Sequence, residues 1–378
     1  MNKSNSSTLV RPRIHSAKKN DLSSLIPLST PLSVHIDVSS VCNFKCSFCF
    51  QADDKGMKEA NLKRGLMDIA LYKKIVDDLK EFPSRVKKIK IGNHGEPTLH
   101  PKIVEMVDYA KKSNTAEIIE MFTNGSKLTE EINDGIVKAG LQRINISIEG
   151  LSDSDYKLVT GVKQSFQTIV DGVKDLFNKK EKNKSDLIIY VKIADQSHAF
   201  DKSSNQKFEM NESDKKFFYD TFSPISDEIF IEKIVPQWPE TQLKEQNQLS
   251  DTGMYGQRSK KWKNVCPFTF MYLHFNCDGS VSPCTLDWAR KVNIGNSQNL
   301  SVKEIWNGVK LKQLQISMLQ KNRKNINVCG SCSAPMVCVE EDFDEKSEEI
   351  LKKNYIKEII SKENPWIENN FQSINFKL

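Results

Sequence analysis

The sequence lacks any apolar run long enough to cross a membrane, and its first thirty residues, rich in Ser, Lys and Arg, lack a signal-peptide core. We therefore expect no export and no membrane partner, and we predict a soluble, cytoplasmic protein. Residues 1–32 are basic and low in apolar content, and we expect them to form a disordered leader. With 378 residues, the remainder can bury a large core without disulfide staples.

A concentrated basic motif is also absent, although the formal net charge is +6. The lysines are spread through stretches of mixed sign, such as KKEKNKSD at residues 179–186. We interpret most of them as solvated surface and expect no nucleic-acid partner.

Short β-rich runs alternate with amphipathic helical patterns through most of the chain. The β-rich runs cover residues 33–38, 86–93, 117–125, 142–150, 187–195 and 228–235, and helical patterns follow at 67–82, 101–113, 128–140, 165–180 and 214–223. This alternation favours an α/β fold with a parallel sheet covered by helices. Six units suit a partial (βα)6 TIM-like barrel better than a closed eight-fold one.

The pattern changes after residue 235, where we place a domain boundary. We predict the partial barrel over 33–235, a small cysteine-rich domain over 236–345, and a C-terminal helix and tail over 346–378. The polar run 196–214 is too long for a simple connector and is interpreted as a lid or a flexible insertion.

Nine cysteines in tight groups, without an export signal, indicate reduced thiolates that bind metal. The first group, CNFKCSFC, contains Cys42, Cys46 and Cys49 and follows the first strand. Structural zinc needs four ligands, whereas three thiolates on an iron-sulfur cubane leave one iron with a free coordination position. Buried apolar cysteines, or a zinc site completed by a distant ligand, are the alternatives.

The C-x3-C-x2-C spacing, with Phe48 before the last cysteine, resembles the signature of the radical S-adenosylmethionine (SAM) superfamily. The resemblance implies a [4Fe-4S] cluster with an open iron that binds SAM. In that family, reductive cleavage of SAM gives methionine and a 5'-deoxyadenosyl radical, which abstracts a hydrogen atom from the substrate. The cofactors would supply the difficult chemistry, and the protein would supply geometry and exclude water.

Further segments fit the resemblance at the ends of predicted strands. Gly95 and Glu96 match a GGEP-like segment of the family that contacts the cofactor's ammonium group, and His94 stands where the first glycine is usual. Ser147 matches a strand end of the SxDG type near the cofactor's ribose and carboxylate, with Glu149 in place of Asp. The arginine that commonly follows this segment in the family is absent. Surface lysines such as Lys157 and Lys163 are the possible substitutes as partner of the cofactor's carboxylate.

The later cysteines resemble the SPASM extension, or its shorter twitch form, which holds auxiliary iron-sulfur clusters. Asp342 stands where a full SPASM extension has another cysteine, so the resemblance implies one auxiliary [4Fe-4S] cluster. Zinc is the alternative metal. The residues DG at 278–279 predict a β-hairpin. The implied ligands are Cys266, Cys284, Cys329 and Cys332, with Cys277 and Cys338 left over.

An auxiliary cluster could remove an electron from a substrate radical. The resemblance to family members with one such cluster implies oxidation of a carbohydrate- or aminocyclitol-like alcohol. We predict Asp287 as the proton acceptor and Lys192 as a second catalytic residue. Flavodoxin or ferredoxin would supply low-potential electrons. A peptide-modifying maturase is the enzymatic alternative. An iron-sulfur or zinc scaffold or electron-transfer protein is the non-catalytic one.

Overall fold

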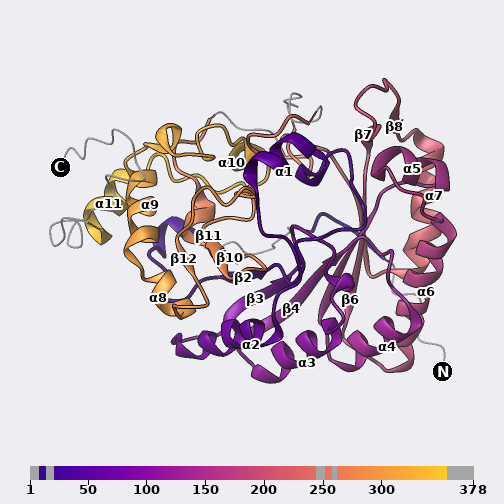
Figure 1. Ribbon diagram of the computed structural model, residues 1–378, viewed down its shortest axis with the longest axis horizontal. Coiled ribbons are helices and arrows are strands. Elements are labelled where there is room, and N and C mark those ends of the chain that lie inside the picture. Colours follow the sequence, from indigo (N-terminus) through magenta and orange to yellow (C-terminus); the bar gives the residue numbers. More distant parts are fainter. Residues whose placement is uncertain (1–7, 14–20, 244–251, 258–261, 356–378) are drawn as a thin grey trace.

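The computed structural model describes residues 8–13, 21–243, 252–257 and 262–355. A ten-stranded sheet with the order β1-β9-β6-β5-β4-β3-β2-β10-β11-β12 organises them (Figure 1). All pairs from β1 to β10 are parallel, and the pairs β10–β11 and β11–β12 are antiparallel.

Six strands of this sheet correspond to the six β-rich runs and confirm the partial barrel. Along β6, Ile189, Val191 and Ile193 are buried, whereas the alternate residue Lys192 lines a cavity on the concave side. This period of two separates the face that packs against helices from the face that carries polar groups. The strands are β2 (Ser33–Ile36), β3 (Val86–Ile91), β4 (Ala116–Thr123), β5 (Arg143–Ile148), β6 (Ile188–Ala194) and β9 (Glu228–Glu232).

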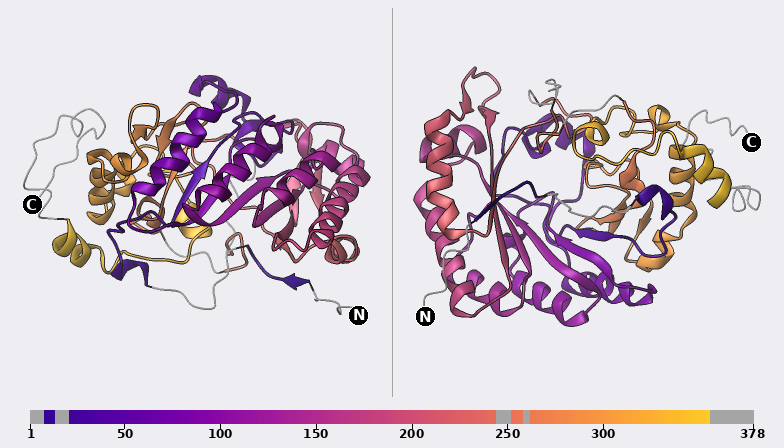
Figure 2. Two further views of the ribbon diagram at one scale, coloured as in Figure 1. Left: turned by 90° about the horizontal axis from the view of Figure 1, so that it is seen from below. Right: turned by 180° about the vertical axis from the view of Figure 1, so that it is seen from behind.

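Helices between the strands cover the outer face of the sheet (Figure 2). Several begin at a side chain that accepts a hydrogen bond from the first turn, as Ser165 does from the Thr168 N–H. The helices are α2 (Ile69–Asp78), α3 (Ile103–Ser113), α4 (Glu130–Lys138), α5 (Asp153–Thr160), α6 (Phe166–Lys182) and α7 (Glu212–Phe222), with α1 (Asp54–Ala60) after the first cysteine loop. Single 3-10 turns are η2 (Phe50–Ala52), η3 (Leu79–Glu81), η4 (Pro97–Leu99), η5 (Ser223–Ile225), η7 (Pro267–Phe270) and η8 (Arg323–Asn325).

The N-terminal segment contains structure that the expectation of a disordered leader missed. Residues Leu9–Val10 form β1, which pairs with the outer edge of β9, and Arg11 forms an ion pair with Glu228. Leu22–Ser24 form the turn η1, in which Leu22 is buried. The expectation is therefore wrong for residues 8–13, because the free backbone edge of β9 and its glutamate provide partners. It is also wrong for residues 21–32, because the C-terminal part of the chain holds them: the Trp306 indole N–H donates to the Leu28 carbonyl (2.9 Å), and the Leu32 N–H donates to the Met271 carbonyl (2.8 Å). Residues 1–7 and 14–20 lie outside the described residues.

The polar run after β6 is largely a two-stranded hairpin of β7 (Gln196–His198) and β8 (Lys207–Glu209). Asn211 then begins α7 with a capping box. The hairpin lies against the first cysteine loop, where the Ser197 and Ser47 hydroxyl oxygens are 2.7 Å apart.

The C-terminal part continues the barrel sheet, because β10 (Tyr272–Phe275) pairs in parallel with β2. The predicted hairpin is confirmed: β11 (Ser280–Ser282) returns antiparallel to β10 through Gly279, which has a φ of 86°. The remaining elements are β12 (Gly295–Asn296), α8 (Val302–Trp306), α9 (Val309–Leu319), α10 (Ala334–Val337) and α11 (Ser347–Asn354). The rest of the predicted terminal helix and tail, beyond residue 355, lies outside the described residues.

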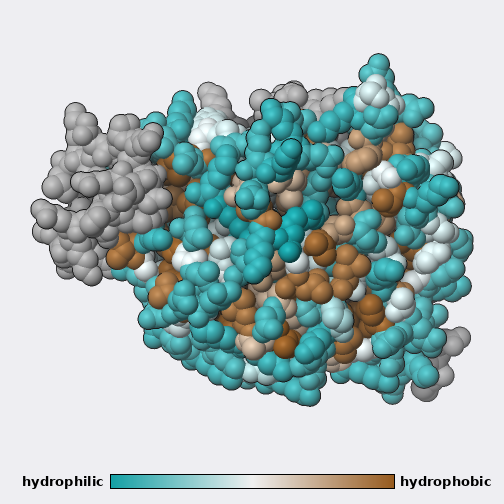
Figure 3. All heavy atoms as spheres, viewed as in Figure 1, coloured by the Kyte–Doolittle hydropathy of each residue, from teal (hydrophilic) through white to brown (hydrophobic). Residues whose placement is uncertain are grey.

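Within the described ranges, the model contains no helix with the length and apolar character needed to cross a membrane. On the face shown in Figure 3, hydrophilic side chains dominate the rim and apolar ones gather toward the middle.

Candidate functional site

The first cysteine loop lies at the end of β2 and is fixed by backbone hydrogen bonds to the end of α5. The Lys45 N–H donates to the Thr160 carbonyl (3.1 Å), and the Ser47 N–H donates to the Val159 carbonyl (2.9 Å). Cys42, Cys46 and Cys49 are half-buried, and none of them forms a disulfide. The loop therefore presents three thiols from a rigid turn.

Burial keeps these thiols protonated when no metal is bound. It raises the pKa of Cys42 to about 11 and that of Cys49 to about 12, and it also raises the pKa of Cys46 well above its ordinary value. Their mutual repulsion as thiolates adds to the effect for Cys46, so a positive metal core would relieve it.

The spacing of the cysteines favours a cluster over a single metal ion. A tetrahedral zinc site with Zn–S bonds of 2.3 Å would hold its sulfurs about 3.8 Å apart. Among the described residues, which include all nine cysteines, no three sulfurs lie within 4.8 Å of one another. Neither cysteine group is therefore arranged as a closed tetrahedral zinc site.

A central cavity of about 270 Å³ faces the three thiols at the carboxyl ends of the strands. Phe48, Gly95, Glu96, Ser147 and Lys192 line it together with the three cysteines. The structure thus brings the residues singled out around the first cluster to one cavity. Lys157 instead projects to solvent and donates to the Gly161 carbonyl oxygen (2.8 Å).

Gly95 and Glu96 connect the loop after β3 to the first cysteine loop. A Cβ atom on Gly95 would lie 2.3 Å from the Ser39 carbonyl oxygen, so only glycine permits this close approach. The Glu96 carboxylate accepts four hydrogen bonds, from the N–H and hydroxyl of Thr98, the Thr123 hydroxyl and the Asn124 N–H. Burial raises the pKa of Glu96, and the hydrogen bonds from these neutral donors oppose that shift. Because none of the donors is charged, the carboxylate is suited to a cationic group such as an ammonium.

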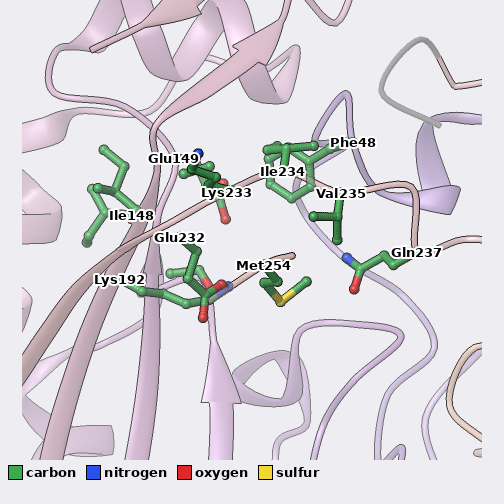
Figure 4. Close-up of a pocket in the computed structure, with 13 residues that line it drawn as sticks. Phe48, Ile148, Glu149, Lys192, Glu232, Lys233, Ile234, Val235, Gln237 and Met254 are labelled. Atoms are coloured by element: carbon green, nitrogen blue, oxygen red, sulfur yellow. Dashed lines mark hydrogen bonds and ion pairs between the residues drawn. The ribbon is translucent and has the colours of Figure 1, made fainter. Parts of the chain in front are cut away.

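Charged side chains from neighbouring strands meet beside this cavity (Figure 4). The Lys192 ammonium donates to Glu232 Oε2 (2.5 Å), and Glu232 Oε1 is buried without a hydrogen-bond partner. Burial raises the pKa of Glu149 to about 7, Lys192 opposes this shift, and Glu232 adds to it. The alternation of EIFIE in β9 places Glu228 and Glu232 on one face, a signal that could have identified Glu232.

Arg13 reaches the central cavity from the N-terminal segment. Its Nη2 donates to the Tyr255 hydroxyl (2.9 Å), and its guanidinium lies 4.9 Å from the centre of the Phe122 ring. Burial disfavours its charge, but Tyr255, Glu232 and Glu120 raise its pKa above the ordinary value. Sequence reasoning missed this residue, because nothing in a short basic segment indicates which distant strand it will join.

Four of the later cysteines line a second, smaller cavity: Cys266, Cys284, Cys329 and Cys332. Burial raises the pKa of each thiol, and repulsion between them adds to the shift for Cys284 and Cys329. Cys277 instead contacts the Ser40 hydroxyl (3.2 Å), and Cys338 does not line the cavity.

A buried cation accompanies these four cysteines. Arg323 is fully buried, and it donates to the carbonyl oxygens of Cys329 (2.9 Å), Cys332 (2.8 Å) and Lys263 (2.7 Å). Its guanidinium also lies 3.6 Å from the centre of the Trp262 ring. These partners are neutral and do not balance the charge of Arg323. That charge lowers the pKa values of Cys266 and Cys332, whereas burial raises them. An anionic thiolate cluster therefore fits the charge of this cavity.

Asp287, the predicted proton acceptor, lies beside the later cysteines. Its two carboxylate oxygens accept hydrogen bonds from the N–H groups of Lys291 and Val292, both at 2.9 Å. Burial raises its pKa to about 6, but it lines the cavity of the later cysteines and not the central one. Asp287 thus organises the loop that follows Cys284.

Comparisons with known families agree with this geometry. Residues 36–197 match the model of the radical SAM superfamily, and residues 266–333 match that of SPASM, an iron-sulfur cluster-binding domain. These domains imply a [4Fe-4S] cluster, SAM and an auxiliary cluster.

Two similar curated proteins each match about a third of the chain. A tungsten-containing aldehyde ferredoxin oxidoreductase cofactor-modifying protein of Pyrococcus furiosus is 31% identical over 128 residues, 34% of this chain and 33% of that protein. A probable GTP 3',8-cyclase of Saccharolobus islandicus is 30% identical over 141 residues, 37% of this chain and 42% of that protein. The chain thus matches less than half of either relative.

Solved structures show a similar fold over most of the chain. BtrN in complex with AdoMet and 2-DOIA aligns with a TM-score of 0.50 at 18% identity, covering 82% of this chain and 96% of BtrN. The anSMEcpe protein with bound AdoMet and Cp18Cys peptide gives 0.51 at 18%, covering 87% and 98%. Streptococcus suis SuiB bound to precursor peptide SuiA gives 0.50 at 13%, covering 89% and 80%.

Proposed function

We propose that this chain, which belongs to the radical SAM superfamily and carries an SPASM domain, oxidises an alcohol carbon of a small, polar, carbohydrate-like substrate. When bound, the cofactors supply a 5'-deoxyadenosyl radical, which takes a hydrogen atom from that carbon, and an auxiliary cluster, which takes one electron. The hydroxyl proton must then go to a base, so that the alcohol loses two electrons and two hydrogens and becomes a carbonyl.

The observation that carries this proposal is a cavity between two separate cysteine sites whose lining includes the charged side chains Arg13, Glu96, Glu149 and Lys192. Cys42, Cys46 and Cys49 would hold the first cluster, and Phe48, Gly95, Glu96 and Ser147 would bind SAM. The four cysteines of the second cavity would hold the auxiliary cluster, with Arg323 balancing part of its negative charge.

We assign the proton acceptor to Glu232 in place of Asp287. Its buried Oε1 has no hydrogen-bond partner, and the Lys192 ammonium holds its other oxygen. Lys192 would thereby orient the carboxylate toward the substrate. Lys192, predicted from the sequence as a catalytic residue, is proposed here as a positioning residue that acts through Glu232.

The central test is an anaerobic assay of the reconstituted, reduced protein with SAM and pools of candidate substrates. We expect 5'-deoxyadenosine, incorporation of deuterium from a labelled substrate carbon, and a product lighter by two hydrogens. The matched control combines Cys42→Ala, Cys46→Ala and Cys49→Ala. Yields no higher than this control would refute catalysis and leave a scaffold or electron-transfer role. Dependence on a peptide instead of a sugar would indicate the peptide-modifying alternative.

A second test addresses Glu232. Glu232→Gln keeps the size of the side chain but removes the base, so product formation should fall about tenfold or more while 5'-deoxyadenosine still forms. Glu209→Gln, at an exposed position of β8, is the matched control. Equal product yields from the two variants would exclude Glu232 as the proton acceptor.

A further inference from the structure

Arg13 lines the central cavity and forms no ion pair with the residues that the structure describes. Its Nη2 donates to the Tyr255 hydroxyl (2.9 Å), and its guanidinium lies over the Phe122 ring, 4.9 Å from the ring centre. Its Nε is buried and has no hydrogen-bond partner in the described part of the chain. A guanidinium has several N–H donors, so this side chain can still donate to a ligand in the cavity.

The carboxylates that act on Arg13 already serve other cations. Burial disfavours the charge of Arg13, and Glu232 and Glu120 are among the groups that favour it and raise its pKa. Glu232 accepts a hydrogen bond from the Lys192 ammonium (2.5 Å), and Glu120 forms an ion pair with Arg143 (3.3 Å). Neither carboxylate is therefore a counterion of Arg13 alone.

The inner face of the barrel next to Arg13 carries a further cation, Lys90. It stands on β3 in register with Glu120 on β4. Burial lowers the pKa of Lys90 to about 8, Glu120 opposes this shift, and the charges of neighbouring cations add to it: Arg13, Lys88 and Arg143. These cations repel one another, and an anionic ligand beside Arg13 would reduce that repulsion.

Arg13 also lies close to the carboxylate that we propose as proton acceptor. Tyr255, its hydrogen-bond partner, follows Met254, which lines both the central cavity and the neighbouring pocket that contains Glu232. Figure 4 draws Met254 and Glu232 among the residues of that pocket. A group held by Arg13 would therefore leave the rest of a small molecule beside Glu232.

We propose that Arg13 binds an anionic group of the substrate, a phosphate or a carboxylate, and that the substrate is accordingly an acidic carbohydrate, a sugar phosphate or a sugar acid. The planar guanidinium can donate paired hydrogen bonds to either group. A partly buried cation without its own counterion is stabilised when a ligand supplies one. The identity of the ligand as substrate rests on the proposed function, whereas the anion site itself does not.

The test measures the binding of inorganic phosphate and of acetate to the reconstituted, unreduced protein saturated with SAM, by isothermal titration calorimetry. At least one of these anions should bind, and Arg13→Gln should weaken that binding about tenfold or more, because it removes the charge and the paired donors. Arg13→Lys keeps the charge and should retain part of the affinity. Tighter binding of phosphate indicates a sugar phosphate, and tighter binding of acetate indicates a sugar acid.

Arg85→Gln is the matched control, since Arg85 is exposed and its Nη1 donates to the Asn114 side chain (2.8 Å). This variant should bind both anions as the wild type does. The proposal would be overturned if the unaltered protein bound neither anion, or if Arg13→Gln and Arg85→Gln changed the affinity equally.

The affinity for SAM shows which molecule supplies the anion, because SAM itself carries a carboxylate. Arg13→Gln should leave SAM binding in equilibrium dialysis unchanged, and phosphate should not compete with SAM. Loss of SAM affinity in Arg13→Gln, or competition between phosphate and SAM, would overturn the assignment to the substrate and give Arg13 to the cofactor.

A structural role of Arg13 predicts a different result, since its contacts with Tyr255 and Phe122 hold the N-terminal segment. Iron content and urea unfolding are therefore measured for each variant. A less stable Arg13→Gln that binds the anions as the wild type does would overturn the proposal. If Arg13→Gln does not fold, Arg13→Lys decides in its place, and wild-type affinity for both anions together with wild-type affinity for SAM would support the retained charge. Absence of 5'-deoxyadenosine would refute the proposed function and leave the anion site standing.

Discussion

Glu149→Gln should change how the stability of the metal-free protein depends on pH. Burial raises the pKa of Glu149 to about 7, against an ordinary value of 4.5. Between these values the folded chain binds a proton at this site that the unfolded chain does not, so stability falls as the pH rises. The gap between 4.5 and 7 corresponds to about 3 kcal/mol. The Gln side chain does not ionise, so the variant should gain about 3 kcal/mol relative to wild type from pH 4.5 to about pH 8.

The assay is urea unfolding of both proteins across this pH range, in reductant and without metal. Under these conditions the raised pKa values of Cys42 and Cys49 keep their thiols neutral, so they do not contribute to the charge near Glu149. Glu59→Gln, with a side chain 67% exposed on α1, is the control for loss of a surface carboxyl group. A difference between Glu149→Gln and wild type that stays constant with pH, or one that favours wild type at high pH, would refute the reasoning.

Three further predictions concern the metal sites and the loop after β3. Cys338→Ala should keep about eight iron atoms per chain after reconstitution, whereas Cys329→Ala should keep about four; iron analysis decides, and equal iron would contradict the ligand assignment. Arg323→Met leaves three carbonyl oxygens without donors and should cost about 3–5 kcal/mol in urea unfolding, more in the iron-loaded protein than in the metal-free one. An equal cost in both forms would show that the cluster does not use this charge. Gly95→Ala should destabilise the protein by about 2–3 kcal/mol and weaken SAM binding in equilibrium dialysis, because its Cβ would lie 2.3 Å from the Ser39 carbonyl oxygen. Unchanged binding would show that this loop does not hold the cofactor.

Elements with a local pattern could be predicted from the sequence. The six barrel strands stand out because β-rich runs and helical patterns alternate, and parallel strands bring their carboxyl ends to one edge. The same rule explains why Phe48, Glu96, Ser147 and Lys192, on four different segments, line one cavity. The hairpin at Gly279 follows from local turn chemistry.

Features that depend on distant partners could not be predicted. β1 forms only because β9, more than 200 residues later, offers a free edge, so the basic composition of the N-terminal segment gave the wrong expectation. Asp287 lies close to Cys284 in sequence, but its carboxylate caps its own loop, and sequence distance does not reveal the direction of a side chain. Arg13 lines the central cavity from the N-terminal segment, and Glu232, on the last barrel strand, lines the neighbouring pocket that it shares with Lys192 and Glu149.

The parallel pairing of β10 with β2 allows two properties to vary independently: the choice of substrate and the distance between the two cysteine sites. Neighbouring strands keep a spacing of about 4.8 Å. The sheet therefore fixes the distance between the first cysteine loop, which follows β2, and the hairpin that carries Cys284. The loop between β9 and β10 supplies Gln237, Trp238 and Met254 to the cavity, and it lies outside the pairing of β10 with β2. Substitutions in this loop can therefore alter which molecule is accepted while the distance between the two cysteine sites stays the same.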